Sequence, residues 1–173
     1  MVTIFRVTQN EDYAYLAPSP YVMEEFRRRM SDGIWFDQSA RGIRLQSRWN
    51  ADWEFVIDQE RIDDHPLGLG DFADMNKLIA ANEAGYRVLK PLVGTAAEIL
   101  TGRCNGRTIW FFNIIRHVHP ARIPSLDDGD IFRVKPTGLD ILCGRKFKEE
   151  VEASGLKGLW FRQVDPDDTV PMI

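Results

Sequence analysis

Two histidines separated by one residue, His117 and His119, form the first arrangement in the chain that could perform chemistry. On a strand, side chains at positions i and i+2 point to the same face, so two imidazoles could share a metal ion. A third ligand would be needed, and Asp127, Asp128 and Asp130 follow closely. The pattern therefore allows a small metal-assisted hydrolase, although the same histidines are also ordinary polar residues for a strand end.

Other catalytic arrangements are incomplete. The chain has no Gly-x-Ser-x-Gly turn, which would present a nucleophilic serine. Cys104 and His117 are offset along their predicted strands, whereas a Cys/His pair must lie within hydrogen-bond reach. Gly68-Leu69-Gly70 lacks the Lys and Ser/Thr of a nucleotide-binding loop, and Asp71 would repel phosphate. We therefore expect no enzyme activity, with no catalytic residue, cofactor or bound metal.

Clustered carboxylates suggest a different kind of site. One cluster contains Asp63 and Asp64, and another contains Asp127, Asp128 and Asp130. The second cluster lacks the complete twelve-residue calcium-loop pattern, which also needs a terminal Glu. Each cluster is either a solvated loop or a surface for a basic partner. A partner with a basic cleft would be steered toward such carboxylates.

Aromatic residues supply candidate anchors for the same surface. Trp49 and Trp53 bracket a predicted turn. An exposed Trp is a typical anchor at a protein interface. Burial in the core is the other possible fate of these two side chains.

Composition limits the classes of partner. The 173 residues suit one domain, 1–173, and 44% hydrophobic content is enough for a core. A net charge of −4 and a pI of about 5.4 argue against nonspecific binding to nucleic acid or to anionic membranes. Cys104 and Cys143 have no metal spacing, and we expect them to be reduced and buried. We see no signal peptide and no apolar stretch of about 20 residues, so we expect a cytoplasmic protein.

The strongest local structural signal is Asn105-Gly106. This pair favours a type I′ turn, whose twist matches that of paired strands. Its flanks, 97–103 and 107–115, have strand-like sequences, which predicts an antiparallel hairpin. Segment 109–115 is nearly all apolar or aromatic, so we expect a central strand covered on both faces.

Two helices are predicted in the N-terminal half. Ser19 can cap the first, with Pro20 at its first position. Asp71 can cap the second, which would end near Gly85. The apolar face of this second helix would contain Phe72, Met75, Leu78 and Ile79. Further strands are predicted at 2–7, 43–48 and 53–58.

The C-terminal segment predicts a strand, a helix, a glycine stop and a final strand. Phe147 and Val151 lie four residues apart and would share one helix face. Gly155 is typical of a left-handed helix stop, and the last strand is predicted at 159–164. A strand is also predicted at 131–135. Irregular mixing of helices and strands, with an antiparallel hairpin, predicts an α+β fold with a mixed or largely antiparallel sheet and a few packed helices.

Three short motifs lie within residues 86–164. The C-terminal motif consists of Lys146-Phe147-Lys148, Val151-Glu152, Gly155-Leu156, Gly158 and Phe161. The two upstream motifs are an aromatic strand at 110–114, which contains Asn113, and the strand entry Asp130-Ile131-Phe132-Arg133. Together these motifs resemble the Imm11 or DUF1629 family of bacterial immunity proteins. The chain departs from the family at 116–119, where Arg-His-Val-His replaces an Asp-rich stretch.

The resemblance implies an immunity protein that binds a cognate antibacterial toxin and occludes its active cleft. We expect the partner surface to include Asp63, Asp64, Asp127, Asp128, Asp130, Trp49 and Trp53. The metal-assisted hydrolase that uses His117 and His119 is the alternative, and self-association into a homodimer also stays open.

Overall fold

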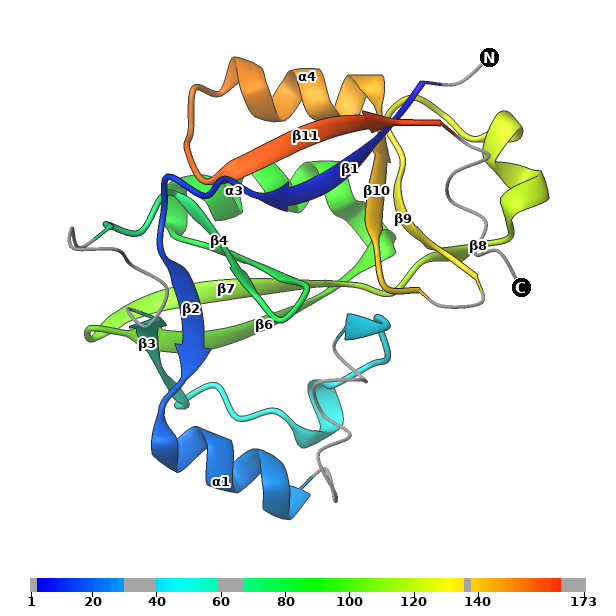
Figure 1. Cartoon of the computed structure of the whole chain (residues 1–173). Coiled ribbons are helices and arrows are strands. Elements are labelled where there is room, and N and C mark those ends of the chain that lie inside the picture. The colour runs from blue at the N-terminus through cyan, green and yellow to red at the C-terminus, as the bar shows by residue number, and fades with distance from the viewer. Residues whose placement is uncertain (1–2, 30–39, 59–66, 136–137, 166–173) are drawn as a thin grey trace.

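In a computed structural model, the chain is described over residues 3–29, 40–58, 67–135 and 138–165. Within these ranges the strands form two sheets (Figure 1). Sheet A has the strand order β11-β1-β10-β9-β8, and sheet B has the order β2-β3-β6-β7-β5-β4. Most neighbouring strands are antiparallel, whereas β3 with β6 and β8 with β9 are parallel. The predicted α+β class is confirmed.

The elements have the following bounds. Sheet A contains β1 (Ile4–Gln9), β8 (His117–Val118), β9 (Ile131–Val134), β10 (Ile141–Gly144) and β11 (Leu159–Val164). Sheet B contains β2 (Tyr15–Pro18), β3 (Glu54–Asp58), β4 (Phe72–Met75), β5 (Leu78–Ala81), β6 (Ala97–Cys104) and β7 (Arg107–Ile114). The helices are α1 (Pro20–Arg29), α3 (Glu83–Val93) and α4 (Arg145–Ala153). Short 3-10 helices are η1 (Gln46–Arg48), η2 (Gly94–Ala96) and η3 (Pro120–Ser125).

The main hydrophobic core lies between the sheets. It joins one face of sheet A, one face of sheet B, and the apolar faces of α3 and α4. A second cluster packs α1 against the other face of sheet B, and a third covers the other face of sheet A near η3. In Figure 1, α4 lies beside β11 at the top and α1 lies at the opposite end of the molecule. None of the helices in the described ranges is long and apolar enough to cross a membrane.

The predicted hairpin at Asn105-Gly106 is confirmed. Strands β6 and β7 pair along eight residues each, and both turn residues have positive φ, 51° and 72°. Strand β7 lies between β6 and β5 and is buried from Phe111 to Ile114. Its long apolar run therefore reflects a central strand with side chains packed on both faces.

The predicted second helix is wrong in its position. Residues 72–81 form the β4–β5 hairpin, whose turn residues Asn76 and Lys77 have positive φ. Helix α3 begins later, at Glu83, and Asn82 caps it by accepting a hydrogen bond from the Gly85 N–H at 3.0 Å. The apolar spacing fits a helix, but it also fits a buried hairpin. The turn has no Gly to indicate it, because Lys77 occupies a position with positive φ.

Strand predictions in the N-terminal half had mixed outcomes. The strands near 2–7 and 53–58 are confirmed as β1 and β3. The strand at 43–48 is wrong, because the chain there turns into η1 and its backbone bonds to a side chain. The buried Glu98 carboxylate accepts from the N–H groups of Leu45 at 2.7 Å and Gln46 at 2.9 Å.

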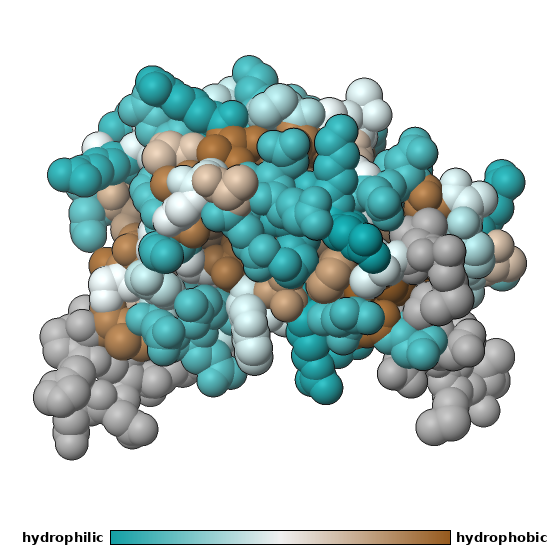
Figure 2. Space-filling view, turned by 90° about the horizontal axis from the view of Figure 1, so that it is seen from above, coloured by the Kyte–Doolittle hydropathy of each residue, from teal (hydrophilic) through white to brown (hydrophobic). Residues whose placement is uncertain are grey.

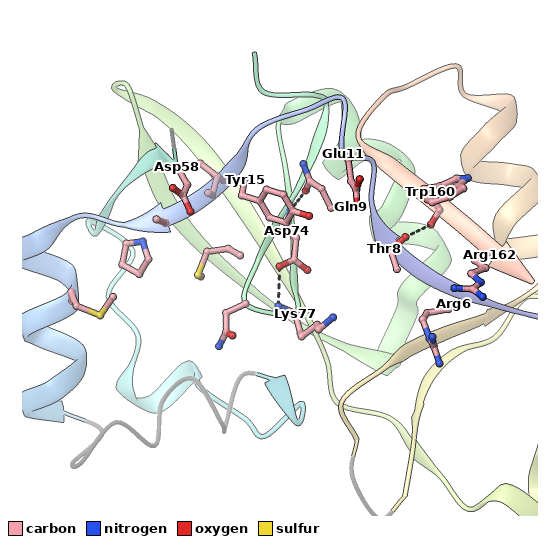
Figure 3. A pocket seen from close by; sticks show the side chains of 16 residues that line it. Arg6, Thr8, Gln9, Glu11, Tyr15, Asp58, Asp74, Lys77, Trp160 and Arg162 are labelled. Atoms are coloured by element: carbon pink, nitrogen blue, oxygen red, sulfur yellow. Dashed lines mark hydrogen bonds between the residues drawn. The ribbon is translucent and has the colours of Figure 1, made fainter. Parts of the chain in front are cut away.

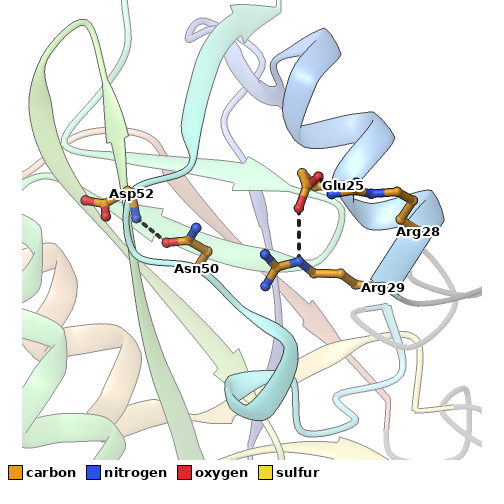
Figure 4. A network of polar contacts seen from close by, with 5 residues as sticks. All are labelled: Glu25, Arg28, Arg29, Asn50 and Asp52. Atoms are coloured by element: carbon orange, nitrogen blue, oxygen red, sulfur yellow. Dashed lines mark hydrogen bonds and ion pairs between the residues drawn. The ribbon is translucent and has the colours of Figure 1, made fainter.

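Local capping holds α1 in place. The Ser19 hydroxyl accepts from the Val22 N–H at 3.3 Å, as predicted for a helix with Pro20 at its start. On its last turns, the buried Glu25 carboxylate bonds to Arg28 and Arg29, the latter at 3.0 Å (Figure 4). Two basic partners on the same helix therefore balance a carboxylate that faces the core.

The C-terminal unit matches its prediction closely. Helix α4 buries Phe147 and Val151. Gly155 has a φ of 70° and its N–H bonds to the Glu152 carbonyl, so the helix ends in the left-handed conformation that favours glycine. Strand β11 then pairs with β1 along its whole length, which brings the two ends of the described chain together.

Arg133 on β9 joins the two sheets. Its side chain is fully buried, and its guanidinium donates to carbonyl oxygens from separate segments of the chain. These acceptors are Ile114 at 2.7 Å, Ala40 at 2.5 Å, Gly138 at 2.8 Å and Lys77 at 2.8 Å. Burial lowers its pKa to about 10, while the charges of Asp74 and Asp140 partly oppose this change. Arg133 is therefore still a cation at neutral pH.

Candidate functional site

The acidic loop before β9 is partly engaged within the chain. The Asp130 carboxylate is 17% exposed and forms a two-pronged ion pair with Arg116, in which one contact is 3.1 Å. It also accepts from the Asp127 N–H at 3.0 Å. The side chains of Asp127 and Asp128 are exposed, and the Asp128 carbonyl accepts from the Phe147 N–H near the start of α4. Asp127 and Asp128 are thus available to a partner, whereas the charge of Asp130 is balanced internally.

The other predicted acidic pair, Asp63 and Asp64, lies outside the described residues.

The two predicted aromatic anchors belong to the core. Trp53 is 1% exposed and packs edge-to-face on Phe26, with ring centroids 4.6 Å apart. This burial corrects the assignment of Trp53 as an anchor, because no partner can reach its ring. Trp49 is half-buried, its indole N–H donates to the Thr101 carbonyl at 2.6 Å, and its ring stacks on Phe55. Their apolar surface stabilises the packing of α1 against sheet B.

The two histidines have separate structural contacts. Both ring nitrogens of His117 lie near carbonyl oxygens, that of Arg41 at 2.7 Å and that of Ile115 at 3.0 Å. His119 caps η3, and its Nδ1 accepts from the Ala121 N–H at 3.3 Å. Across the described ranges, no group of three or more His, Cys, Asp or Glu side chains could hold a metal ion. Among the described residues, the third ligand that the hydrolase alternative requires is therefore not brought to this pair.

A cavity of about 670 Å³ lies where the two sheets meet. Strands β1 and β11 form its wall on the side of sheet A, while β2 and the β4–β5 turn form its wall on the side of sheet B. Strands β2 and β4 are the two outer strands of sheet B and lie close together without pairing in the described residues. The cavity lies between these strands and β1 and β11.

Basic and aromatic side chains gather at the sheet A end of the cavity (Figure 3). The register of β1 with β11 places Arg6 directly opposite Arg162, and Thr8 directly opposite Trp160. Arg6 forms an ion pair with Asp140 at 3.1 Å, but its buried Nε has no hydrogen-bond partner. Arg162 is exposed, and Trp160 is 60% exposed. Arginine 162 forms no ion pair or hydrogen bond with the described part of the chain.

Acidic side chains also line the cavity, among apolar and amide residues and Lys77. Asp74 lies between the two ends, and Asp58 lies on the far side from the arginines (Figure 3). The Asp74 Oδ1 accepts from the Lys77 N–H at 3.2 Å. Burial raises the pKa of Asp74, against the lowering effects of that hydrogen bond and of the Lys77 and Arg133 charges. A half-buried carboxylate with a perturbed pKa in a cavity is typical of functional sites.

Gln9 connects the two walls of this cavity. Its Nε2 donates to the carbonyls of Tyr13 at 2.9 Å and Ala14 at 3.0 Å, and its Oε1 accepts from the Asp74 N–H. The Gln9 side chain is buried. It therefore satisfies backbone groups on the outer edge of β4 that a neighbouring strand would otherwise bind.

A second cavity, of about 1070 Å³, lies beside the β6–β7 turn. Its wall includes Arg87, which is paired with Glu83 on α3, and Cys104. Burial, together with the charge of Glu54, raises the pKa of the Cys104 thiol. The thiol is thus held in its protonated, unreactive form. Both Cys104 and Cys143 are free and buried, as predicted.

The arrangement at the first cavity was missed in the sequence. The predicted strand at 159–164 already implied that Trp160 and Arg162 face away from the buried Phe161, because side chains alternate along a strand. The pairing of β11 with β1, which adds Arg6, joins residues about 150 positions apart and has no local signal.

Comparison with known proteins adds no relative. No family model matches the chain, and no curated protein matches it.

Proposed function

We propose that this chain is a cytoplasmic immunity protein that binds a protein toxin and neutralises it by covering its working surface. The observation that carries the proposal is the exposed pair Trp160 and Arg162 on β11, an outer strand of sheet A. Trp and Arg are the residue types most enriched among side chains that dominate binding energy at interfaces. Their position beside a cavity gives a partner both an aromatic anchor and a recess.

The surface around β11 supports contact with a protein. Figure 2 shows that the face containing α4 and β11 is largely hydrophilic, with small apolar patches between polar side chains. An interface of this kind has an apolar centre and a polar rim. The exposed Asp127 and Asp128 add negative charge near the start of α4, which favours a partner with a basic cleft.

The resemblance of residues 86–164 to immunity proteins agrees with this location. That segment contains β6 to β11 and therefore Trp160 and Arg162, whereas Arg6 is contributed by β1 from outside it. The proposed mechanism is steric and electrostatic. The chain covers the toxin's active cleft, and no covalent bond changes.

A survival assay tests the proposal. Host cells would express the toxin candidate encoded beside this gene, with or without this chain, and we expect the chain to restore growth. Trp160→Ala is expected to reduce protection and to weaken the purified complex by about 2 kcal/mol or more, the usual loss at a binding hot spot.

Tyr21→Ala provides a matched control. Tyr21 is an exposed aromatic residue, 68% accessible, on α1 at the opposite end of the molecule. The Tyr21→Ala substitution should leave protection unchanged. The proposal fails if the unmodified chain neither binds the toxin nor restores growth, or if both substitutions have the same effect.

A further inference from the structure

We propose that Arg6, Arg162 and Trp160 form a recognition site for one carboxylate of the partner, an Asp or Glu side chain beside an apolar residue. This inference rests on the proposed function because it names the chemical group by which the partner is held.

The two arginines are in an unfavourable arrangement without a ligand. They lie directly opposite each other on antiparallel strands, where like charges destabilise a sheet. One carboxylate, Asp140, contacts Arg6 at 3.1 Å. The Arg6 Nε is buried without a hydrogen-bond partner, which is costly for a charged donor. The Arg6 side chain is 31% exposed, so a second carboxylate could reach its guanidinium and would relieve the repulsion between the arginines.

Arginine geometry favours a carboxylate over a neutral group. A guanidinium presents parallel N–H donors that match the two oxygens of a carboxylate. Arg162 is exposed, so a partner can reach it without displacing an internal ion pair in the described part of the chain. A carboxylate at this position would face one exposed guanidinium and a second that is 31% exposed and paired with Asp140.

Trp160 gives the site its apolar part. It lies two residues before Arg162, so both side chains point to the same face of β11. Its ring is 60% exposed, and its strand neighbour across the pair is Thr8. An apolar side chain packed on this ring would exclude water from the neighbouring ion pair, which strengthens the charge interaction.

The remaining cavity wall selects against other anions. Glu11, Asp58 and Asp74 line the same cavity and outnumber its one further cation, Lys77, so the wall beyond the arginines is net negative. A polyanion such as nucleic acid would meet repulsion there, whereas a single carboxylate on a neutral or basic segment would not. The exposure of Trp160 and Arg162 also suits a protein segment, because a small-molecule pocket encloses most of its ligand.

The test uses the full chain and two blocked dipeptides as probes, acetyl-Phe-Asp-amide and acetyl-Phe-Asn-amide. They differ only in the carboxylate. NMR would follow the Trp160 indole N–H and the Arg162 Nε–H during titration. We expect the Asp dipeptide to shift both signals and to saturate at roughly millimolar concentration, as for a very small ligand. The Asn dipeptide should bind at least about ten-fold more weakly, since charge-assisted hydrogen bonds are the stronger ones.

Substitutions then assign the site. Arg162→Gln should abolish the shift of the Trp160 signal. Arg87→Gln removes an equal charge from α3, far from β11 in the sequence, and should leave the titration unchanged. The site is refuted if neither dipeptide shifts these signals, if both bind equally, or if Arg162→Gln has no effect while its spectrum shows a folded protein.

This result is separate from the survival assay. If the Asp dipeptide binds as expected but the chain does not protect cells, the carboxylate site stands and the immunity function falls. If the chain protects cells but the dipeptides do not bind, the immunity function stands and the carboxylate site is wrong.

Discussion

Arg133 and the pair Arg6–Arg162 differ in how their charges are satisfied. The guanidinium of Arg133 is fully buried and donates to carbonyl oxygens from segments of both sheets. Arg162 is exposed and has no such partner within the described ranges, and Arg6 has one ion pair and one buried donor without a partner. The guanidinium of Arg133 is thus bonded within the chain, whereas that of Arg162 is available to a partner.

The comparison separates structural cations from candidate binding cations. A buried charge persists only if hydrogen bonds replace the water it loses, and the carbonyls around Arg133 do so. Arg6 meets that condition only in part, with one carboxylate partner, and the exposed Arg162 keeps its contact with water. Residue type alone therefore does not separate a structural arginine from a candidate binding arginine. The number of hydrogen-bond acceptors that the chain supplies to its guanidinium does.

The β4–β5 turn links the two regions. The Lys77 carbonyl accepts from Arg133 at 2.8 Å, and the Lys77 N–H donates to Asp74 in the cavity wall at 3.2 Å. A single turn residue therefore contacts both the buried cation and the cavity. We therefore expect a substitution of Arg133 to alter the cavity wall at Asp74, and a substitution of Asp74 to alter the contacts of Arg133, through this turn.

The largest expected effect comes from Arg133→Met. It would leave several buried carbonyl oxygens without donors, so we expect the free energy of unfolding to fall by about 3–5 kcal/mol. Urea denaturation measures this loss. Arg133→Lys should recover little, because an ammonium group lacks the forked geometry that reaches separate acceptors. A loss below about 1 kcal/mol for Arg133→Met would mean that this cation is not structural.

An Asp74→Asn substitution tests the cavity wall through the pH dependence of stability. Burial raises the pKa of Asp74 above its ordinary value of 3.8, so the native state binds the proton more tightly than the unfolded state. The stability contributed by protonated Asp74 is therefore present below pH 3.8 and is lost as pH rises toward the raised native pKa. Asn does not titrate and can still accept the Lys77 N–H.

We expect Asp74→Asn to be more stable than the unmodified chain at pH 7, with the difference closing below pH 3.8. Denaturation of both proteins across a pH series measures this, since other carboxylates cancel in the difference. A constant difference at all pH values would show that burial does not set the charge state of Asp74.

The sequence predicted elements whose signals are local. The turn at Asn105-Gly106, the cap at Ser19 and the helix stop at Gly155 each depend on a few adjacent residues, and all three are confirmed. The β4–β5 hairpin was misread because Lys77 adopts a positive φ that is rare outside glycine and asparagine. Local preference there is overridden by packing and by the hydrogen bond from Arg133 to its carbonyl.

The candidate site depends on contacts that no local pattern encodes. Opposed arginines require the register of β1 with β11, which is set by packing across the whole chain. The burial of Trp53 follows from α1 packing on sheet B, again a distant contact. Only the outward direction of Trp160 and Arg162 was available from strand alternation.

In the acidic loop, too, one charge is paired within the chain while its neighbours are exposed. Asp130 is satisfied by Arg116, whereas Asp127 and Asp128 are exposed. Asp130→Asn is expected to lower stability by about 1 kcal/mol, because the pair is only partly shielded from solvent.

Asp127→Asn with Asp128→Asn should leave stability unchanged but slow toxin association at low salt. Stopped-flow association across a salt series tests this. An unchanged rate and salt slope would place the loop outside the interface.

For Arg162→Gln we expect a small gain in stability or none. Removing one of two facing charges relieves repulsion, so stability should stay equal or rise by at most about 0.5 kcal/mol. The gain should shrink in high salt, because Arg162 is exposed and its field is screened. Thermal denaturation of this variant and of Arg133→Met compares the change in stability that each arginine substitution causes. If Arg162→Gln instead destabilised the chain by more than about 1 kcal/mol, Arg162 would be a structural cation like Arg133, and its repulsion from Arg6 could no longer indicate a place kept for a ligand.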